Sequence, residues 1–352
     1  MKADYYLNLA RGGLRMPIGA DLILREQADA EAVLEDGKRL GRVIEQTARR
    51  FGTPLAMSLM DLTLEKAELL RLLGINTAAD EFHFDACPPD AHLELLKRRL
   101  GDPPGQRMQA ALDAISHVAT VRDLVPVGMS IGPLSLMTKL LADPITPLYL
   151  AGQGVRGDED PEVRSAERIM DMTCLIVLRS VRAQIKAGAR AICIAEPAAS
   201  CAYFSPIQLE AGSDLFDRFV IQPNQEVRAA IAAGGADLMF HCCGELTELM
   251  LRKFCELRPA ILSLGSSRKL WEDAAVVPQD IVLFGNLPTR KFASDQSITI
   301  ERVREMTRDL IARMRAVGRA FILGSECDVL SVKGSEATIR AKVDAMLHEP
   351  AD

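Results

Sequence analysis

Short apolar runs of strand length alternate with helical segments along almost the whole chain. Residues 125–131 and 191–195 are two such runs, and between them residues 164–187 carry apolar side chains at helical spacing. This alternation is typical of a parallel sheet covered by helices, because parallel strands need a long crossover connection. Eight strands are predicted, over residues 15–19, 54–60, 125–131, 191–195, 238–241, 260–264, 281–285 and 320–323.

Eight strands favour closure of the sheet, so we predict an α/β fold with one (β/α)8 TIM barrel as a single domain over residues 1–352. No linker rich in Gly, Ser or Pro divides the chain. Residues 74–119 are too long for one crossover, and they predict an inserted helical segment near the barrel mouth. Helices are predicted over residues 26–51, 164–187, 206–233, 246–255, 300–317 and 336–347.

Charge and composition argue against several classes of protein. The net charge is −6 and no block of like charges stands out, which argues against nucleic acid as a partner. No apolar run approaches the roughly 20 residues that cross a bilayer, so no membrane association is expected. The start of the chain lacks the pattern of a secretion signal, and eight cysteines are spread without a CxxC pair. These features predict a cytoplasmic protein with reduced thiols.

His241-Cys242-Cys243-Gly244 closes the fifth predicted strand, and Cys327 follows the eighth. Side chains alternate along a strand, so His241 and Cys243 should face one way and Cys242 the other. An imidazole and two thiolates delivered to one rim suit a catalytic Zn²⁺ with an open position. The alternative is that these cysteines, like many in a reduced protein, only fill the core.

Active-site residues of such barrels lie at the C-terminal ends of the strands. This rule selects Asp61, Ser130, Glu196 and Asn286, with Met129 nearby. Structural roles remain open for them: Asp61 as a helix cap, Glu196 in a salt bridge, Asn286 in a turn and Met129 in the core.

The carboxylates of Glu326 and Asp328 flank Cys327. One of them is expected to accept a hydrogen bond from the free ring nitrogen of His241, the usual arrangement behind a metal-bound imidazole. The alternative is that both are loop carboxylates in water.

Several motifs resemble the uroporphyrinogen decarboxylase superfamily: Gly132-Pro133-Leu134, Glu196-Pro197-Ala198-Ala199-Ser200, Ser205-Pro206 and Gly285-Asn286-Leu287. Within it, Met60-Asp61-Leu62-Thr63 and His241-x-Cys243-Gly244 with a late Cys327 are similar to the corrinoid-dependent methyltransferase branch. That branch includes the methylcobalamin:coenzyme M methyltransferases. The resemblance covers nearly the whole chain, and the His-Cys-Cys triplet is its most specific part.

The resemblance implies a zinc-dependent methyltransferase with His241, Cys243 and Cys327 as metal ligands. The donor would be methylcobalamin carried by a partner corrinoid protein. The acceptor would be a small molecule, either a thiol such as coenzyme M or homocysteine, or tetrahydrofolate. Asp61, Glu196 and Asn286 would be the catalytic candidates, and Met129 and Ser130 the candidates for cofactor binding, with methionines as an apolar wall against the corrin ring.

Two departures from the family patterns matter. Residues 14–19 lack the arginine-rich pattern with which the decarboxylases bind propionates, so decarboxylation is the weaker alternative. The sixth strand is followed by Ser266-Ser267, where coenzyme M enzymes can place an additional acidic ligand, so the fourth zinc ligand is unassigned. A barrel that binds corrinoid without catalysis is the alternative from another class.

Overall fold

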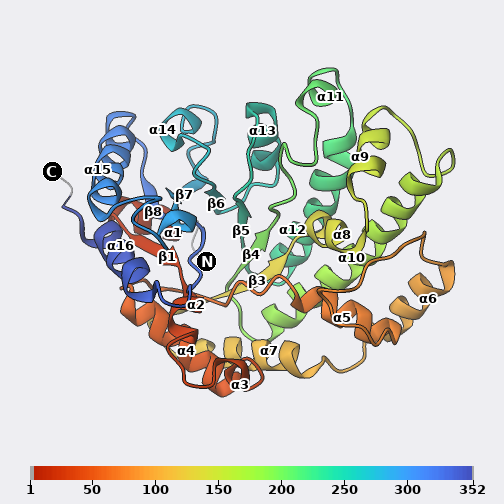
Figure 1. Cartoon of the computed structure of the whole chain (residues 1–352), viewed down its shortest axis with the longest axis horizontal. Helices are drawn as coiled ribbons and strands as arrows, with labels where there is room; N and C mark the ends of the chain where they lie inside the picture. Colours follow the sequence, from red (N-terminus) through yellow and green to blue (C-terminus); the bar gives the residue numbers. More distant parts are fainter. Residues whose placement is uncertain (1–3, 351–352) are drawn as a thin grey trace.

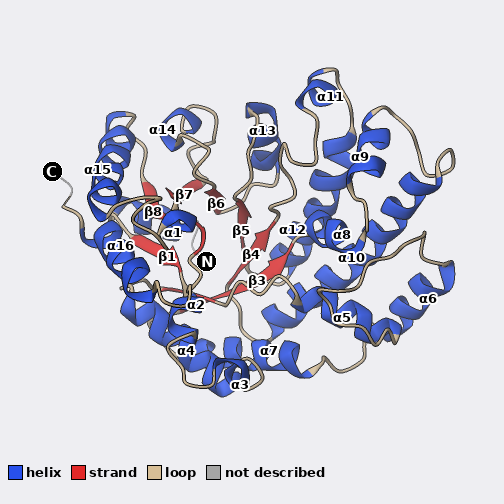
Figure 2. Ribbon diagram, in the orientation of Figure 1, coloured by secondary structure: helices blue, strands red, loops and turns tan. Residues whose placement is uncertain are grey.

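All eight predicted strands are present in the computed structural model, which describes residues 4–350. They run parallel in one sheet in the order β1-β8-β7-β6-β5-β4-β3-β2, so the predicted barrel is confirmed (Figure 2). The bounds are β1 Arg15–Ile18, β2 Leu55–Met57, β3 Val125–Ile131, β4 Ala191–Ala195, β5 Asp237–Cys242, β6 Ile261–Leu264, β7 Val282–Leu287 and β8 Phe321–Asp328.

The barrel interior is filled by alternate residues of the strands. Met16, Met129, Met239 and Ile322 belong to this inner cluster, and helix α1 (Tyr5–Arg11) adds Tyr6 to it. Tyr6 Oη donates to a carboxylate oxygen of Asp237 at 3.1 Å, at the start of β5, which ties α1 to the N-terminal ends of the strands. The opposite rim, where the strands end, is the one that carries the candidate site.

The barrel has one seam. Within the described residues no backbone ladder joins β1 to β2. Pro17 removes one amide donor from β1, and β2 has only three residues, so neither strand offers a full row of partners. Thr53 Oγ1 donates to Met16 Sδ at 3.2 Å, so side chains bridge the seam.

Helices surround the sheet in chain order (Figure 1). Two predicted helices are each broken in the structure. The first restarts where Asp36 caps α4 by accepting from Arg39 N. The second stops at Glu210, just before Gly212 takes a positive φ of 88°, and helical structure resumes at Asp217. The remaining helices are α2 Ala20–Leu24, α3 Ala30–Val33, α4 Gly37–Arg50, α5 Leu64–Leu73, α6 Asp90–Arg99, α7 Gln106–Ala119, α8 Pro133–Leu140, α9 Ile145–Gly152, α10 Pro161–Lys186, α11 Pro206–Glu210, the π-helix η1 Asp217–Ile221, α12 Gln222–Ala233, α13 Glu248–Glu256, α14 Leu270–Asp273, the 3-10 helix η2 Thr289–Lys291, α15 Ile300–Ala316 and α16 Glu336–His348.

The insertion predicted over residues 74–119 is helical. Its second half is α7, which packs on α4 and β3 as the ordinary barrel helix between β2 and β3. Its first half carries α6, which packs on α5 and α10 and lies at the outer edge of the helix layer in Figure 1. A bridge between Phe84 and Leu141 joins the insertion to the segment that follows β3 and α8. Among the described residues, no helix is long and apolar enough to span a membrane.

Candidate metal centre

His241 and Cys243 lie on the inner side of the sheet at the C-terminal end of β5. Met239, two residues earlier, belongs to the inner cluster, whereas Phe240 and Cys242 pack in the cluster between sheet and helices. Cys242 is fully buried there, and its thiol donates to Ala199 O at 3.6 Å. The strand alternation therefore separates Cys242 from its two neighbours, as the sequence predicts.

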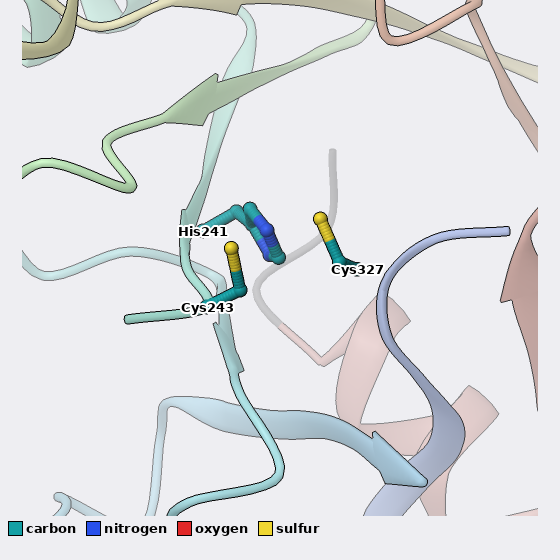
Figure 3. Close-up of side chains that lie close together, drawn as sticks. All are labelled: His241, Cys243 and Cys327. Atoms are coloured by element: carbon teal, nitrogen blue, oxygen red, sulfur yellow. The ribbon is translucent and has the colours of Figure 1, made fainter. Parts of the chain in front are cut away.

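Cys327 reaches the same point from β8. One ligand atom each of His241, Cys243 and Cys327 lies within 4.8 Å of the others, a spacing that one metal ion can bridge. Figure 3 shows the imidazole and both sulfurs turned toward a common space, from two separate parts of the chain. His241 is buried and both cysteines are half-buried, so the cluster lies at the edge of the interior.

The imidazole of His241 is oriented by Ser263. Nδ1 lies 2.8 Å from Ser263 Oγ, and the two residues are directly paired across β5 and β6. With the proton on Nδ1, Ser263 accepts and Nε2 presents its lone pair to the cluster. Nε2 is buried without a hydrogen-bond partner. A buried nitrogen of this kind costs free energy unless its lone pair binds a metal ion or a hydrogen-bond donor. The residues present therefore fit a metal ion such as Zn²⁺.

The two thiols of the cluster share a proton unequally. Cys243 donates to Cys327, which raises the pKa of Cys243 and lowers that of Cys327. Burial opposes the lowering at Cys327, while His241 and Arg290 reinforce it. One thiolate is thus favoured by the protein alone, and a divalent cation would favour the second.

Arg290, on η2, lies against the cluster. Its guanidinium helps to lower the pKa of the Cys327 thiol, and its backbone amide donates to Glu326 Oε1 at 3.3 Å. Burial acts to lower the pKa of Arg290, but the neighbouring Cys243 and Cys327 together raise it by more than burial lowers it. The net shift of the pKa is therefore upward. The side chain is exposed at the rim.

The predicted role of Glu326 or Asp328 behind His241 is wrong, because Ser263 takes that place. The carboxylate of Glu326 instead accepts from the amide and hydroxyl of Ser266 at the end of β6. Asp328 is buried with Oδ1 unpartnered, and burial, with Asp21 and Cys327 nearby, raises its pKa well above the usual range.

Asp61 makes a turn contact just before α5 and an ion pair, but it does not cap the helix, whose N-cap residue is Thr63. Its Oδ1 accepts from the Thr63 amide at 3.0 Å, and its Oδ2 lies 2.6 Å from Arg107 Nη2. Thr63 is the residue before α5 and Arg107 lies on α7, and the cluster of candidate metal ligands does not include Asp61. Its catalytic role stays a prediction.

Glu196 is fully buried beneath the start of α8. Its carboxylate accepts from the amides of Leu134 and Ser135 at 3.1 and 2.8 Å, and from Asn224 Nδ2 at 2.9 Å. Burial nevertheless raises its pKa. Gly132 permits this approach, since a Cβ there would lie 2.1 Å from Glu196 Cδ. These contacts describe a structural carboxylate, and its catalytic role stays a prediction without support from them.

Asn286 holds a turn next to the candidate metal site. Its Nδ2 donates to Gly265 O at 2.7 Å and to Arg268 O at 2.8 Å, which holds the turn after β6. Gly265 in turn lies so close to Cys243 that an added Cβ would be 2.4 Å from the Cys243 carbonyl oxygen. The contacts of Asn286 therefore hold the backbone of Gly265 next to Cys243, one of the candidate metal ligands.

Met129 and Ser130 lie on opposite faces of β3. Met129 belongs to the inner cluster of the barrel. Ser130 Oγ donates to buried Glu65 at 2.7 Å, on the helix side of β3, where Ser180 makes the same contact. Their binding of a cofactor stays a prediction, and the hydroxyl of Ser130 is engaged elsewhere.

Sequence reasoning missed two residues of the site. Ser263 is the polar residue within the apolar strand Ile261–Leu264, a signal that could have drawn attention to it. Arg290 follows the seventh strand by three residues, but its approach to Cys327 depends on how η2 folds back on β8.

The fold and the site together define a parallel (β/α)8 barrel with a soft-ligand cluster of one imidazole and two thiols at the C-terminal rim. The chain belongs to the uroporphyrinogen decarboxylase (URO-D) family, whose model matches residues 23–348. No curated protein sequence matches the chain.

Two solved structures resemble the chain to different degrees. A methyltransferase from Methanosarcina mazei has a TM-score of 0.68 and 17% identity, and the similarity covers 98% of both chains. A 3-keto-D-glucoside 4-epimerase from E. coli, in its apo form, has a TM-score of 0.38 and 12% identity over 75% of this chain and 97% of its own. The first likeness supports the fold, and the second is too weak to carry an argument.

Proposed function

We propose that this protein is a zinc-dependent methyltransferase that moves a methyl group from a methylated corrinoid protein to a small acceptor. The observation that carries the proposal is the convergence of His241, Cys243 and Cys327, with the buried Nε2 of His241 left unpartnered. Three protein ligands of this kind are the usual set of a catalytic zinc with one open position.

The protein's own residues prepare the site for a nucleophilic acceptor. A zinc ion bound here would supply Lewis acidity that keeps an acceptor thiol deprotonated near neutral pH. Ser263 holds the imidazole with Nε2 toward the cluster. Cys243 and Cys327 supply thiolates, whose negative charges offset the positive charge of the ion. A sulfur bound to the ion would therefore stay nucleophilic.

The comparisons support the proposed methyl transfer in two ways. The chain belongs to a family that it matches over residues 23–348, and a structure of the same fold bears the name methyltransferase. The acceptor we favour is a thiol, because the ligand set suits a sulfur in the open position. Tetrahydrofolate is the alternative acceptor, and its nitrogen does not need a metal-held thiolate.

Decarboxylation is the weaker candidate. Arg15 is the only arginine in residues 14–19, and its Nη1 donates to the backbone oxygens of Leu347 and Glu349 at 3.2 and 2.5 Å. These contacts tie it to the C-terminal segment. A tetracarboxylate substrate needs several cations in its pocket, and this arginine is already committed.

The test is metal content followed by methyl transfer. We expect about one zinc per chain in the purified protein, and loss of most of it in His241→Ala and Cys327→Ser. Cys255→Ser is the matched control, because that half-buried thiol lies on α13 outside the cluster. Methylcobalamin should lose its methyl group, seen by absorbance, only when a thiol or tetrahydrofolate is added.

The outcomes separate the candidates. A zinc content near zero would remove the proposed mechanism and leave the non-catalytic barrel or the decarboxylase. Full zinc with no spectral change in either acceptor would contradict methyl transfer. Methyl transfer to tetrahydrofolate but not to a thiol would identify tetrahydrofolate as the acceptor. If that transfer is unaffected by loss of zinc, the metal has no role in the reaction.

A further inference from the structure

Cys243 and Cys327 bring two thiols to one point of the rim. Their sulfur atoms lie within 4.8 Å of each other and of a ring nitrogen of His241. Both sulfurs are turned toward the same space in Figure 3. Two sulfurs at this separation can act as ligands of one ion or, after oxidation, become the two halves of a disulfide.

The remaining gap between the sulfurs is within the range of side-chain rotation. A disulfide bond is about 2.05 Å long, so the sulfurs must approach by less than about 3 Å. Rotation about the Cα–Cβ bond carries a cysteine sulfur between staggered positions. Cys327 is the last residue but one of β8 and is followed by exposed residues at 332–334, whereas the backbone of Cys243 lies against Gly265. We therefore expect Cys327 to make most of the movement.

The other thiols near the site differ in burial or in the face that carries them. Cys242 is fully buried on the opposite face of β5, and Cys193 is fully buried in the inner cluster of the barrel. Cys201 is half-buried, as Cys243 and Cys327 are, so a small oxidant can reach all three. Its amide donates to Glu245 O at 2.8 Å, which joins the segments that follow β4 and β5. Cys201 is therefore the thiol against which the specificity of the pair is measured.

We propose that Cys243 and Cys327 form a redox pair, in which a small peroxide converts the two thiols to a disulfide and releases the metal ion. Formation of the disulfide depends only on the two cysteines, whereas release of the metal rests on the proposed function. The thiolate is the form of cysteine that binds a metal ion, so a disulfide leaves His241 as the one remaining ligand of the three. Oxidation thus switches the site off, and reduction by a dithiol restores it.

The oxidation balances with one peroxide molecule for each pair of thiols. One sulfur attacks a peroxide oxygen, the O–O bond breaks, and a sulfenic acid forms while the other oxygen takes up the thiol proton and leaves as water or an alcohol. The second thiol attacks the sulfenic sulfur, forms the S–S bond and expels the hydroxyl group as water. Two electrons pass from the sulfurs to the peroxide. Where a divalent ion has replaced the two protons, hydrogen peroxide yields the free ion and two hydroxide ions instead.

The test exposes the zinc-loaded protein to hydrogen peroxide and follows thiols, zinc and cross-linked peptides, none of which needs catalytic turnover. The chain has eight cysteines, so thiol titration in denaturant should fall from eight to six per chain, because two thiols form one disulfide. Zinc should be released in step with this loss, as seen with a chromophoric chelator. Peptide mapping without reduction should find Cys243 joined to Cys327, and dithiothreitol should restore both the thiols and zinc binding.

Cys201→Ser is the matched control on the same rim, and Cys255→Ser is the control on α13. Both variants should lose two thiols and their zinc at the rate of the unmodified protein. In Cys327→Ser, peroxide should leave Cys243 without a cross-link, whether or not metal is present. The metal-free unmodified protein should form the disulfide severalfold faster than the zinc-loaded protein, because a bound ion occupies the sulfur lone pairs that attack the peroxide.

Each other outcome has a defined meaning. Release of zinc without a cross-link between Cys243 and Cys327, or a cross-link of either residue to Cys201, overturns the redox pair. Oxidation of one sulfur to sulfinic acid in place of a disulfide also overturns it, since no second thiol was then in reach. Bound zinc that peroxide does not release rejects only the redox pair. A disulfide in a protein that never holds zinc supports the pair and rejects the proposed function.

Discussion

At the scale of single residues, Ser263 decides which way the imidazole of His241 points. The two are neighbours across β5 and β6, and their side-chain atoms lie 2.8 Å apart. Ser263→Ala should weaken zinc binding by about 10–100-fold, the usual cost of losing the partner behind a metal-bound histidine. Competition with a chromophoric chelator measures this change.

The control for Ser263 is Ser297→Ala, an exposed serine whose affinity for zinc should match that of the unmodified protein. Equal zinc affinity in Ser263→Ala would mean that packing alone orients the imidazole.

Glu65 is a second residue whose environment makes a prediction. It is buried on the helix side of β3, where Ser130 and Ser180 donate to one oxygen and the other has no partner. Burial raises its pKa from 4.5 to about 7. The folded state therefore binds a proton that the unfolded state releases between these values, and stability should fall as pH rises through that window.

Glu65→Gln should remove this component, which is on the order of 3 kcal/mol at most for a shift of this size. Urea unfolding at pH 5 and pH 8 measures the difference between the variant and the unmodified protein. Glu245→Gln, at an exposed position, is the control and should keep the original pH dependence. A pH dependence unchanged by Glu65→Gln would show that Glu65 is ionised in the folded protein.

At the scale of elements, the turn after β6 supports the end of β5. Gly265 N donates to Cys242 O at 3.2 Å, and Asn286 of β7 holds the carbonyl of Gly265. A Cβ at Gly265 would lie 2.4 Å from the Cys243 carbonyl oxygen, which is backbone and cannot rotate away. Gly265→Ala should therefore displace a metal ligand.

We expect Gly265→Ala to weaken zinc binding at least tenfold and to destabilise the protein by about 1–3 kcal/mol, as overpacking does. Zinc competition and chemical denaturation measure the two effects. Gly101→Ala is the control, because a Cβ there meets no atom within 4 Å. If Gly265→Ala keeps its affinity for zinc, the ends of β5 and β6 can move apart without displacing Cys243.

At the scale of the whole molecule, the candidate metal ligands come from strands that are not neighbours. Cys243 follows β5 and Cys327 is in β8, with β6 and β7 between them in the sheet. A ligand that binds only the folded state stabilises it, by about 4 kcal/mol when free ligand exceeds the dissociation constant a thousandfold. Zinc should therefore raise the melting temperature, and a chelator should reverse the effect.

Cys327→Ser should abolish most of this stabilisation, whereas Cys255→Ser should retain it. Calorimetry with and without zinc measures both. An equal rise in the two variants would place the bound zinc elsewhere on the protein.

The sequence alone determined the strands, and the site residues that depend only on strand alternation. The period of two in residues 238–243 separates His241 and Cys243 from Cys242, and the number of apolar runs predicts the eight-stranded barrel. These features are local, because the direction of a side chain on a strand follows from its neighbours in the chain. Helix breaks were missed where a single capping side chain decides, as at Asp36.

Only the tertiary structure decided which side chains meet. The pairing of His241 with Ser263 follows from the register of β5 and β6, the approach of Arg290 to Cys327 from the path of η2, and the burial of Glu196 from its position under α8. Each contact joins residues distant in sequence, and the free energy that selects it comes from packing across the whole barrel. Local patterns carry no record of that register, which is why these contacts appear only once the chain is folded.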